Sequence, residues 1–351
     1  MRLSLLLFVG AVCAHTTIKN IVIDGNAYHP FDERIDHLVG PVKRIGWTYD
    51  VVPPTFNPVT DFSSPDIACR KNAIAPALKA IARAGAEVIL LWTPITRMHW
   101  GPGVAYLGRL PTPETSPNDI KFFKIYEKGF DATADKWANQ LANDEGDMYK
   151  LRLPSDIAPG TYILRAELIA LHGNMKELMS HDLKEQIQIY PYCFSIEITG
   201  SGTANPEGVT FPGPYKGTDP SFTFAPAATY LNSTEGFTEE NSKFVPPGPP
   251  LYDGKYAAPT GPRPTVTREQ TGAYPPELEV IYQDLIRKIE RPALKLATYI
   301  NTAWPGYQAD SDTMKTYAQI GAGVFKESNE AIEAVKGDIL AFKNATQGYK
   351  S

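Results

Sequence analysis

The chain has 351 residues, 43% of them hydrophobic, and a formal net charge of -5 at pH 7. A chain of this length can bury a full core and has room for one large domain with a smaller appendage. The mild negative charge, without a basic stripe of interleaved aromatic residues, argues against a nucleic-acid-binding protein and favours neutral molecules or small ions as partners.

The first segment of the chain has the pattern of a secretory signal peptide, at residues 1–14. Arg2 supplies the positive start, Leu3 to Val12 the apolar stretch, and Val12-Cys13-Ala14 a small-residue cleavage site. The stretch is too short to span a bilayer. We therefore predict a secreted protein whose mature chain begins at His15, with a free α-amine beside its imidazole. Both nitrogens of that residue can bind one metal ion, although a histidine at this position can also be an accident of where the leader ends.

Cysteine use agrees with export. Cys13 leaves with the leader, and Cys69 and Cys193 remain as an even pair, as expected in an oxidising compartment. Closing so long a loop would stabilise the fold by about 4 to 5 kcal/mol in the chain-entropy model. Glycosylation sequons at Asn232 and Asn344 are also consistent with secretion.

Short alternating or β-branched runs continue from His15 to about Thr199. Turn residues such as Pro154-Ser155-Asp156 separate them. Many short strands with such breaks predict an all-β, immunoglobulin-like antiparallel β-sandwich, which we place at residues 15–252. Its last part, from about Gly200, is rich in Gly and Pro and is interpreted as long loops lying on the sandwich. The predicted strands are residues 17–23, 87–93, 120–126, 149–153, 161–171 and 192–199.

The character of the chain changes after Tyr252. Residues 253–274 are rich in Pro, Gly and Thr and are interpreted as a linker. We predict a small helical hairpin or bundle in residues 275–351, with its apolar faces packed on each other; a groove for a partner is the alternative. No apolar tail ends this region, so we expect no lipid anchor there. The helical stripes are Leu278, Ile281, Leu285 and Ile289, ended by Pro292, and then Ala331, Val335, Ile339 and Phe342.

Further ligands for a metal at His15 are sought among polar residues at the sandwich edge. His99 comes just before Gly101-Pro102-Gly103, which forces a turn, so we expect it on a loop. On its own, it fits an ordinary surface-loop histidine better than a metal ligand.

Another polar cluster comes after the strand at residues 161–171. The strand alternation places His172 at the strand end, on the opposite face from Arg165. Gln188 and Tyr190 are two residues apart and share a face of the next strand, so His172, Gln188 and Tyr190 are candidates for an outer shell around a metal. The alternative is a half-buried sandwich tyrosine with a solvated glutamine beside it.

Several segments, in order, resemble the fungal cellulose-active lytic polysaccharide monooxygenases of auxiliary activity family nine. The likeness runs from His15 to about Tyr252. The segments are "HTTIKNIVIDG", "PVTDFSSPDIAC", "HWGPGVAYL", "IKFFKIYEKG", "LPSDIAPGTYILRAELIALHG", "QIYPYC", "FPGPYKGTDP" and "PPGPPLYDG". One histidine motif alone would not be specific, but so many blocks in the same order are.

The resemblance implies a copper site held by three nitrogens: the α-amine and Nδ1 of His15 and the Nε2 of His99. Such planar nitrogen donors suit Cu(II). It further implies that Tyr190 is the axial residue and that His172 and Gln188 position the oxidant. Since all three ligand nitrogens must be deprotonated, copper affinity should fall as the pH drops.

The resemblance also implies that Cys69 and Cys193 form a disulfide and that Arg165 and Glu167 have a supporting role. The activity it implies is oxidative cleavage of β-1,4-glucan chains, with an external electron donor and dioxygen or hydrogen peroxide. We expect a monomer that meets its polysaccharide on a flat face. The candidate sugar-contacting aromatic residues, chosen by position, are Tyr28, Trp100 and Tyr230.

The chain departs from the common family pattern in several places. Ala166 stands where a histidine is usual, a second disulfide is missing, and residues 174–185 form a longer and more charged stretch than usual. These departures leave the preferred glucan and the oxidised carbon open. The helical region has no usable counterpart, and because it lacks cysteine it is not a small disulfide-stapled cellulose-binding module.

Three other functions compete with this assignment. A non-catalytic copper-binding protein would keep His15 and His99 but could dispense with the outer shell. A glycoside hydrolase needs two facing carboxylates, and Glu167 has no evident partner. A cell-wall-associated protein would depend chiefly on the helical appendage.

Overall fold

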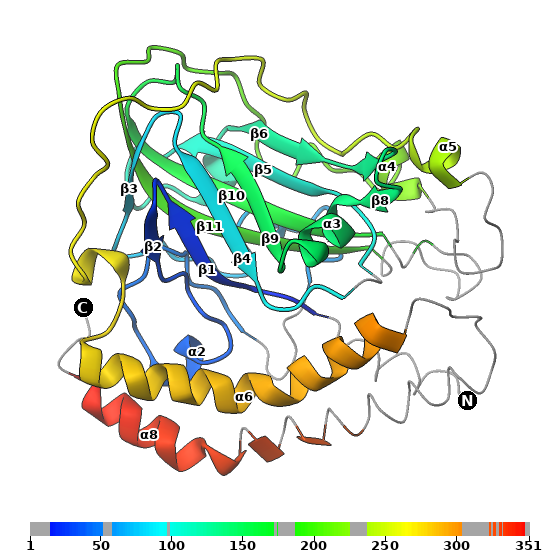
Figure 1. The fold of residues 1–351 in the computed structure, drawn as a ribbon. Helices are drawn as coiled ribbons and strands as arrows, with labels where there is room; N and C mark the ends of the chain where they lie inside the picture. The colour runs from blue at the N-terminus through cyan, green and yellow to red at the C-terminus, as the bar shows by residue number, and fades with distance from the viewer. Residues whose placement is uncertain are drawn as a thin grey trace.

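The computed structural model describes residues 15–51, 58–96, 99–171, 174, 187–224, 237–303, 323, 326–327, 330–331 and 333–347. The predicted leader, together with His172, Tyr230 and Asn232, lies outside these residues. Two sheets stack as a β-sandwich, and a pair of helices lies beneath it (Figure 1). The predicted β-sandwich with a helical C-terminal extension is therefore confirmed.

The smaller sheet has four strands in the order β2-β1-β4-β9, all antiparallel. Strand β1 lies inside this sheet and begins close to His15, so the first residues of the predicted mature chain are fixed by pairing with β4. The strands are β1 (Ile18–Ile23), β2 (Asn26–Tyr28), β4 (Glu87–Trp92) and β9 (Met148–Arg152).

The larger sheet has five strands in the order β3-β11-β10-β5-β6. Its strands are antiparallel except for the β3–β11 pair, which is parallel. A short hairpin leads from this sheet into helix α3 (Ala138–Asp144). The strands are β3 (Ala80–Arg83), β11 (Gln188–Thr199), β10 (Gly160–Ala170), β5 (Gly103–Arg109) and β6 (Phe122–Lys128), and the hairpin is β7 (Phe130–Asp131) and β8 (Lys136–Trp137).

The predicted strands correspond to β1, β4, β6, β9, β10 and β11, shifted by at most a few residues. Strand β5 was not predicted, because its residues from Gly103 to Gly108 are all buried and show no polar alternation. Alternation marks a strand only where one face meets water.

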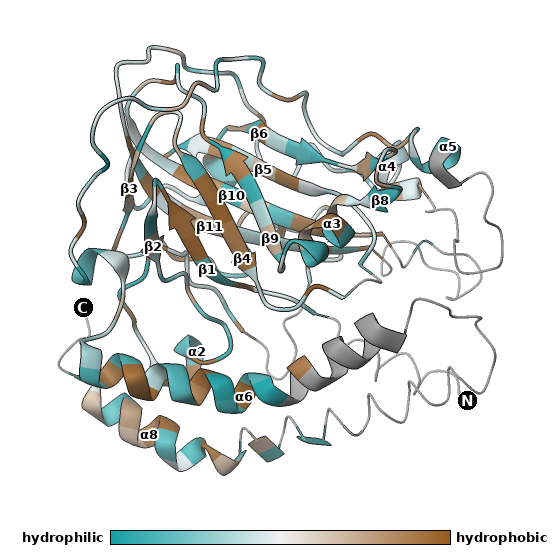
Figure 2. Cartoon of the chain, viewed as in Figure 1, coloured by the Kyte–Doolittle hydropathy of each residue, from teal (hydrophilic) through white to brown (hydrophobic). Residues whose placement is uncertain are grey.

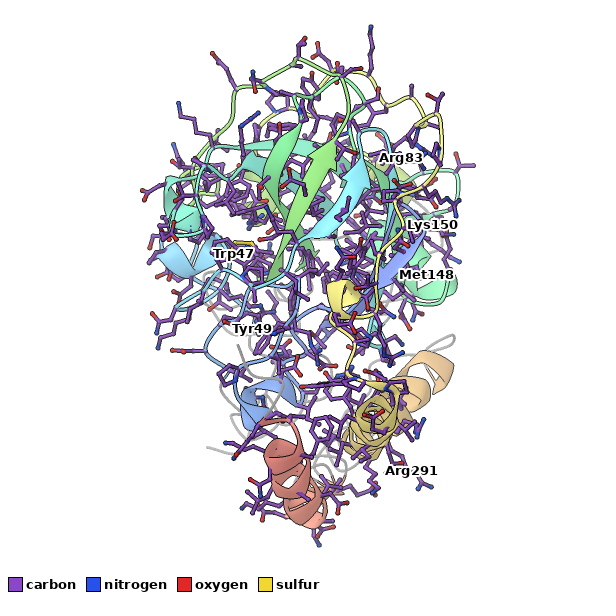
Figure 3. All side chains as sticks on the ribbon, turned by 90° about the vertical axis from the view of Figure 1, so that its left-hand side faces the viewer. Trp47, Tyr49, Arg83, Met148, Lys150 and Arg291 are labelled. Carbon is purple, nitrogen blue, oxygen red and sulfur yellow. A yellow bond between two sulfur atoms is a disulfide. The ribbon has the colours of Figure 1, made fainter. Side chains whose placement is uncertain are left out.

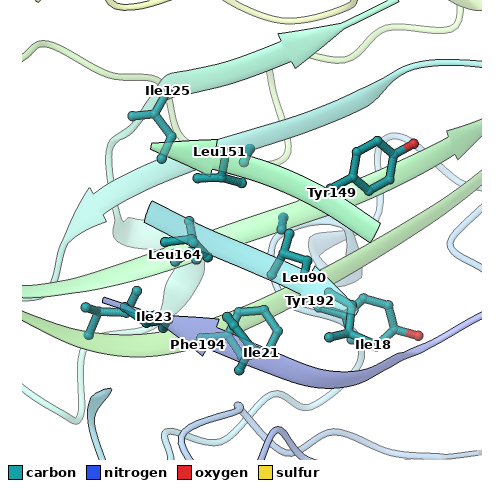
Figure 4. Close-up of a cluster of buried hydrophobic side chains, with 14 of the residues drawn as sticks. Ile18, Ile21, Ile23, Leu90, Ile125, Tyr149, Leu151, Leu164, Tyr192 and Phe194 are labelled. Atoms are coloured by element: carbon teal, nitrogen blue, oxygen red, sulfur yellow. The ribbon is translucent and has the colours of Figure 1, made fainter. Parts of the chain in front are cut away.

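Two apolar clusters sandwich the larger sheet. The cluster between the sheets contains Ile21, Leu90, Leu164, Tyr192 and Phe194 (Figure 4). The second cluster lies on the other face of β10 and β11, where the described loop residues from Gly200 onward cover it, as predicted. Its members include Tyr106, Ile163, Phe211, Tyr215 and Phe222.

Short helical turns punctuate the loops. They are α2 (Asp36–Val39), α4 (Pro220–Thr223) and α5 (Phe237–Asn241), with 3-10 turns at Pro65–Ile67, Pro117–Asp119 and Glu269–Thr271. Of these, α2 packs in one apolar cluster with the C-terminal helices, so it joins them to the sandwich domain.

Residues 253–274, interpreted as a linker, are bound along the sandwich instead. The Ser155 amide donates to Lys255 O at 2.6 Å, and Asn26 Nδ2 donates to Pro264 O at 3.0 Å. The Arg83 guanidinium reaches Gly261 O at 2.6 Å. Proline leaves such a stretch without donors for a strand of its own, but its carbonyl oxygens accept bonds from the sandwich. The strap, residues 253–274, therefore leads the chain along a fixed path to the helices.

The predicted helical pair is present as α6 (Pro276–Ala303) and α8 (Lys336–Ala345), which contact each other and α2. Figure 2 shows apolar segments on both helices, and the side view of Figure 3 places the helices below the sandwich with side chains between them. Among the residues that the structure describes, none belongs to a helix long and apolar enough to cross a membrane.

Two details of the helix prediction were wrong. Helix α6 continues through Pro292, since one lost backbone bond does not end a helix whose preceding turns are fixed by packing. Ile281 is 45% exposed, and Tyr282 and Ile286 take the buried positions. The buried face of the pair consists of Leu278, Tyr282, Leu285, Ile286, Ile289, Val335, Ile339 and Phe342.

Candidate metal centre

Three rings from distant parts of the chain meet at the sandwich edge. The ring centroids of His15 and Tyr190 are 5.9 Å apart, and those of His99 and Tyr190 are 5.7 Å apart. His99 is 1% exposed and Tyr190 is fully buried. The two histidines predicted as ligands thus flank the same tyrosine, which the resemblance assigned to the axial position.

The donor set at this place fits copper. The ring nitrogens of both histidines are buried, and removal of the predicted leader would add an α-amine on His15. Two imidazoles and an amine are the nitrogen donors that Cu(II) prefers. No group of three or more His, Cys, Asp or Glu side chains gathers within the described part of the chain, so a metal here depends on the amine as its third donor.

Gln188 lies beside Tyr190 on the same strand. The Tyr190 hydroxyl donates to Gln188 Oε1 at 2.7 Å, which places the predicted glutamine at the site. Burial raises the pKa of Tyr190 well above its usual value of 10, so the phenol stays protonated. His172, the third predicted outer-shell residue, lies outside the described residues. Leu171, the residue before His172, is fixed because its amide donates to Trp100 O at 2.7 Å.

A threonine ladder fixes the backbone next to His15. The Thr16 hydroxyl donates to Thr93 O at 2.9 Å, and the Thr17 amide donates to Thr93 Oγ1 at 3.0 Å. In return, the Thr93 amide donates to Thr17 O at 2.8 Å. Thr16 and Thr17 are fully buried, so these hydrogen bonds fix the two residues after His15.

A buried charged group lies behind this ladder. The Tyr192 hydroxyl is 2.6 Å from Glu33 Oε1 and 3.2 Å from Thr16 O. The Arg70 guanidinium lies over the Tyr192 ring at 4.3 Å, and its Nε donates to Pro191 O at 3.0 Å. Sequence reasoning missed Glu33 and Tyr192, because nothing local indicates that these residues, 159 apart in the chain, meet beneath the amino terminus.

Helix α3 fixes the loop that carries His99. Asn139 Nδ2 donates to His99 O at 2.6 Å and to Ile169 O at 2.9 Å, and Tyr149 donates to Asn139 Oδ1. Gly101 has a φ of +148°, and a Cβ there would collide with Ile169 O, so only glycine permits this close approach. Asn139 was also missed, since a single asparagine in a seven-residue helix carries no sequence signal.

Arg165 and Glu167 form an ion pair at 2.7 Å, with both side chains fully buried. Arg165 also donates to Ile67 O and Ala68 O, each at 2.8 Å, and Tyr215 donates to Glu167 Oε1. Such a pair is structural, and its burial keeps Glu167 away from any sugar.

Cys69 and Cys193 form a disulfide with a Cα–Cα separation of 5.5 Å. Cys193 is the cross-strand partner of Arg165. The disulfide and the buried ion pair therefore fasten the same loop to β10 and β11, which carry the rear of the site.

Two of the proposed sugar-contacting residues were wrong. Tyr28 is fully buried, and its hydroxyl accepts a bond from the Ile81 amide at 3.1 Å. Trp100 is 3% exposed and belongs to the second apolar cluster. Both rings thus serve packing, and Tyr230 lies outside the described residues.

Two further predicted positions have clear surroundings. Ala166, where the resemblance would place a histidine, is 1% exposed and belongs to the apolar cluster between the sheets. Asn344, one of the two sequon asparagines, is exposed on α8, so the structure leaves it accessible.

Comparison with known proteins gives consistent matches. The family model for Auxiliary Activity family 9 (formerly GH61) matches residues 15–235. An AA9 family lytic polysaccharide monooxygenase A from Geotrichum candidum is 34% identical over 254 residues, which are 72% of this chain and 81% of that protein. One from Thermoascus aurantiacus is 32% identical over 248 residues, which are 68% of this chain and 100% of that protein.

Solved structures agree. The extended catalytic domain of LPMO9A from Hypocrea jecorina is 30% identical, with a TM-score of 0.58, over 71% of this chain and 95% of that one. A glycoside hydrolase family 61 member, Cel61B, from the same organism is 29% identical, with a TM-score of 0.57, over 68% of this chain and 100% of that one.

Proposed function

The chain belongs to Auxiliary Activity family 9, a family of copper-dependent lytic polysaccharide monooxygenases, and we propose that it is secreted and cleaves β-1,4-glucan chains oxidatively. The oxidant is dioxygen or hydrogen peroxide, and the electrons come from an external donor. The substrate is cellulose or a related polysaccharide.

One observation supports this proposal above the others: His15 and His99 flank the buried ring of Tyr190 at 5.9 and 5.7 Å. His15 precedes a strand that lies inside the sheet, and His99 lies on a loop clamped by Asn139. Copper, when bound, supplies the one-electron redox chemistry that the side chains of the protein lack.

The residues of the chain have separate roles in this proposal. His15, through its α-amine and ring, and His99, through its ring, hold the metal. Thr16 and Thr17 orient the amino terminus. Tyr190 closes the side of the site that faces the core and aligns Gln188 through the 2.7 Å hydrogen bond, which leaves the glutamine side chain placed to orient an oxidant.

The first test uses mature protein that begins at His15, loaded with copper, with amorphous cellulose and ascorbate. We expect mass spectrometry to detect oxidised oligosaccharides. His15→Ala and His99→Ala should abolish these products. Lys79→Ala is the control, because Lys79 pairs with Glu197 on an exposed surface, at the other end of β11 from Tyr190, and it should retain activity.

The result also separates the competing functions. Soluble sugars that are not oxidised, released without copper or reductant, would indicate a hydrolase. Tight copper binding without any oxidised product from a panel of glucans would favour a non-catalytic copper-binding or cell-wall-associated protein. Either result would overturn the proposal.

A further inference from the structure

Residues 32–36 contact two distant parts of the protein at once. Their inward side meets the strands beneath the amino terminus, and their outward side meets helix α6. We propose that the C-terminal helices are a positioning element for the amino-terminal histidine, acting through this turn on Glu33. The inference rests on the proposed function, since it concerns the site that His15 forms there.

The outward side is fixed by buried polar contacts with α6. Arg34 Nη1 lies 3.0 Å from Glu290 Oε1, and the Tyr282 hydroxyl donates to Asp36 Oδ1 at 3.0 Å. Arg44 Nε donates to the other oxygen of Asp36, also at 3.0 Å. If the helix moved away, Arg34 would keep its pair with Asp32 and Asp36 its pair with Arg44. The Tyr282 hydroxyl and the Glu290 carboxylate would lose these partners, which makes the contact specific to the docked helix.

Apolar packing adds to these bonds. Ile35 and Val39 are fully buried in one cluster with the apolar stripe of α6 and with α8. The Arg44 guanidinium also lies over the rings of Tyr274 and Tyr282, at 4.7 and 5.1 Å. The helices are therefore docked against the domain and are not a tethered appendage.

The strap contributes to the same support. The His29 amide donates to Thr271 O at 2.8 Å, and Arg44 Nη1 donates to Gly272 O. Residues 29–44 lie between the end of β2 and an isolated bridge at Gly46. The outward face of this loop is thus held by segments beyond residue 266, which lie more than two hundred residues later in the chain.

The inward side reaches His15 through two residues. The Glu33 carboxylate is 1% exposed and accepts the Tyr192 hydroxyl at 2.6 Å. The same hydroxyl lies 3.2 Å from Thr16 O, so its proton is shared by the two acceptors and the bond to Glu33 is the shorter. Displacement of Glu33 would leave the hydroxyl without its main acceptor and redirect it to the carbonyl next to His15.

The geometry therefore makes a continuous path: α6, residues 32–36, Glu33, Tyr192, Thr16 and then His15. In this path Glu290 contacts Arg34 and Tyr282 contacts Asp36, and neither contacts His15 or His99 directly, so they are positioning residues. The sequence offered no sign of such a link, because its non-covalent steps, from α6 to residues 32–36, from Glu33 to Tyr192 and from Tyr192 to Thr16, join residues that are far apart in the chain.

The test uses the full mature chain and point variants. The interface variant is Tyr282→Phe with Glu290→Gln, and the direct variant is Glu33→Ala, which removes the acceptor of the Tyr192 hydroxyl. Lys288→Gln is the matched control, because it lies on the same helix and pairs with Asp284 and Asp338, at 2.9 and 3.2 Å, on the exposed side.

The first readout is hydrogen–deuterium exchange of metal-free protein. A peptide that starts at His15 reports the Thr17 amide, and a peptide that covers Ile196 in β11 reports global stability. We expect exchange at Thr17, relative to Ile196, to rise about tenfold in the interface and direct variants, the factor that corresponds to about 1.4 kcal/mol. The control should match wild type.

The second readout is the electron paramagnetic resonance spectrum of the Cu(II) protein with its copper dissociation constant. Both variants should shift the spectrum and weaken binding about tenfold, and Lys288→Gln should leave both unchanged.

Two other outcomes are decisive. Faster exchange confined to α6, with Thr17 and the copper spectrum as in wild type, would show that the helices only pack on the domain and would overturn the inference. Suppose instead that wild-type protein binds no copper, but the interface variant still exchanges faster than wild type at Thr17. That result would overturn the proposed function and leave the positional coupling in place.

Discussion

The side-chain amide of Asn139 donates to the carbonyl oxygen of His99 at 2.6 Å. A second bond from the same amide, to Ile169 O at 2.9 Å, ties that loop to β10. One residue of α3 thus joins the loop that carries a predicted ligand to the strand that ends beside the site.

Replacing this asparagine should loosen the ligand loop. Asn139 is fully buried, so Asn139→Ala leaves two carbonyl groups and the Tyr149 hydroxyl without a partner, at a cost of about 1 to 3 kcal/mol for each group that water does not reach. We expect a lower free energy of unfolding and weaker copper binding, measured by denaturant titration and calorimetry. Asn118→Ala is the control, because its amide also bridges two carbonyl oxygens, those of Pro65 and Phe211, away from His99. Equal copper affinity in both variants would contradict the assigned role.

The buried ion pair of Arg165 and Glu167 should be among the most sensitive positions for stability. Glu167→Leu removes one partner and leaves an uncompensated buried guanidinium, so we expect a loss of about 3 to 5 kcal/mol in the free energy of unfolding. Glu167→Gln should cost less, because it keeps the hydrogen-bonding shape. Glu197→Gln is the control, since its pair with Lys79 is largely exposed and such pairs contribute about 0 to 1 kcal/mol. A mild effect of Glu167→Leu, as small as that of the control, would show that the pair is not structural.

The sandwich was predictable from sequence because most of its strands carry a pattern that strands alone produce. Strand β1 alternates and is followed by turn residues, and β10 and β11 are long runs in which β-branched and aromatic residues recur. Strand β5 could not be predicted from alternation, because both of its faces are buried. The helices were predicted from the spacing of their apolar residues, but this spacing places Ile281 on the buried face, where the structure has Tyr282. A tyrosine accepts a buried position there because Asp36, 246 residues away, accepts its hydroxyl proton.

The candidate site divides in the same way. His15, His99 and Tyr190 could be chosen by residue type and by resemblance, because the groups that bind or border a metal belong to these side chains and are visible in the sequence. The residues that hold them in place could not, since Asn139, Glu33 and Thr93 are ordinary residues that matter only through contacts far along the chain. Tyr28 and Trp100 failed for the opposite reason: an aromatic residue signals packing as readily as sugar binding, and only burial decides between them.

Copper should stabilise the mature protein, and the α-amine of His15 should be essential for that effect. Copper at one hundred times its dissociation constant should add about 2.7 kcal/mol to the free energy of unfolding. A chain with one extra alanine before His15 keeps both imidazoles but converts the amine into an amide, so its melting temperature should respond much less to copper. His99→Ala should behave in the same way. Full stabilisation of the extended chain would show that the amine is not a ligand.

Acidification should weaken the fold at the interface between α6 and the sandwich, where His29 Nε2 lies 3.8 Å from Glu279 Oε1. Burial, with the nearby charge of Arg44, lowers the pKa of His29 below its usual 6.5, although Glu279, Asp36 and Asp32 oppose the shift. The unfolded chain then binds more protons below pH 6.5, so the stability that neutral His29 gives is present above that pH and is lost as the pH falls toward the lowered pKa. The loss is at most about 1.4 kcal/mol per pH unit for one histidine. Denaturant titrations of metal-free protein at pH 7, 6 and 5 should show a smaller decline for His29→Gln than for wild type, and parallel declines would mean that His29 does not report on this interface.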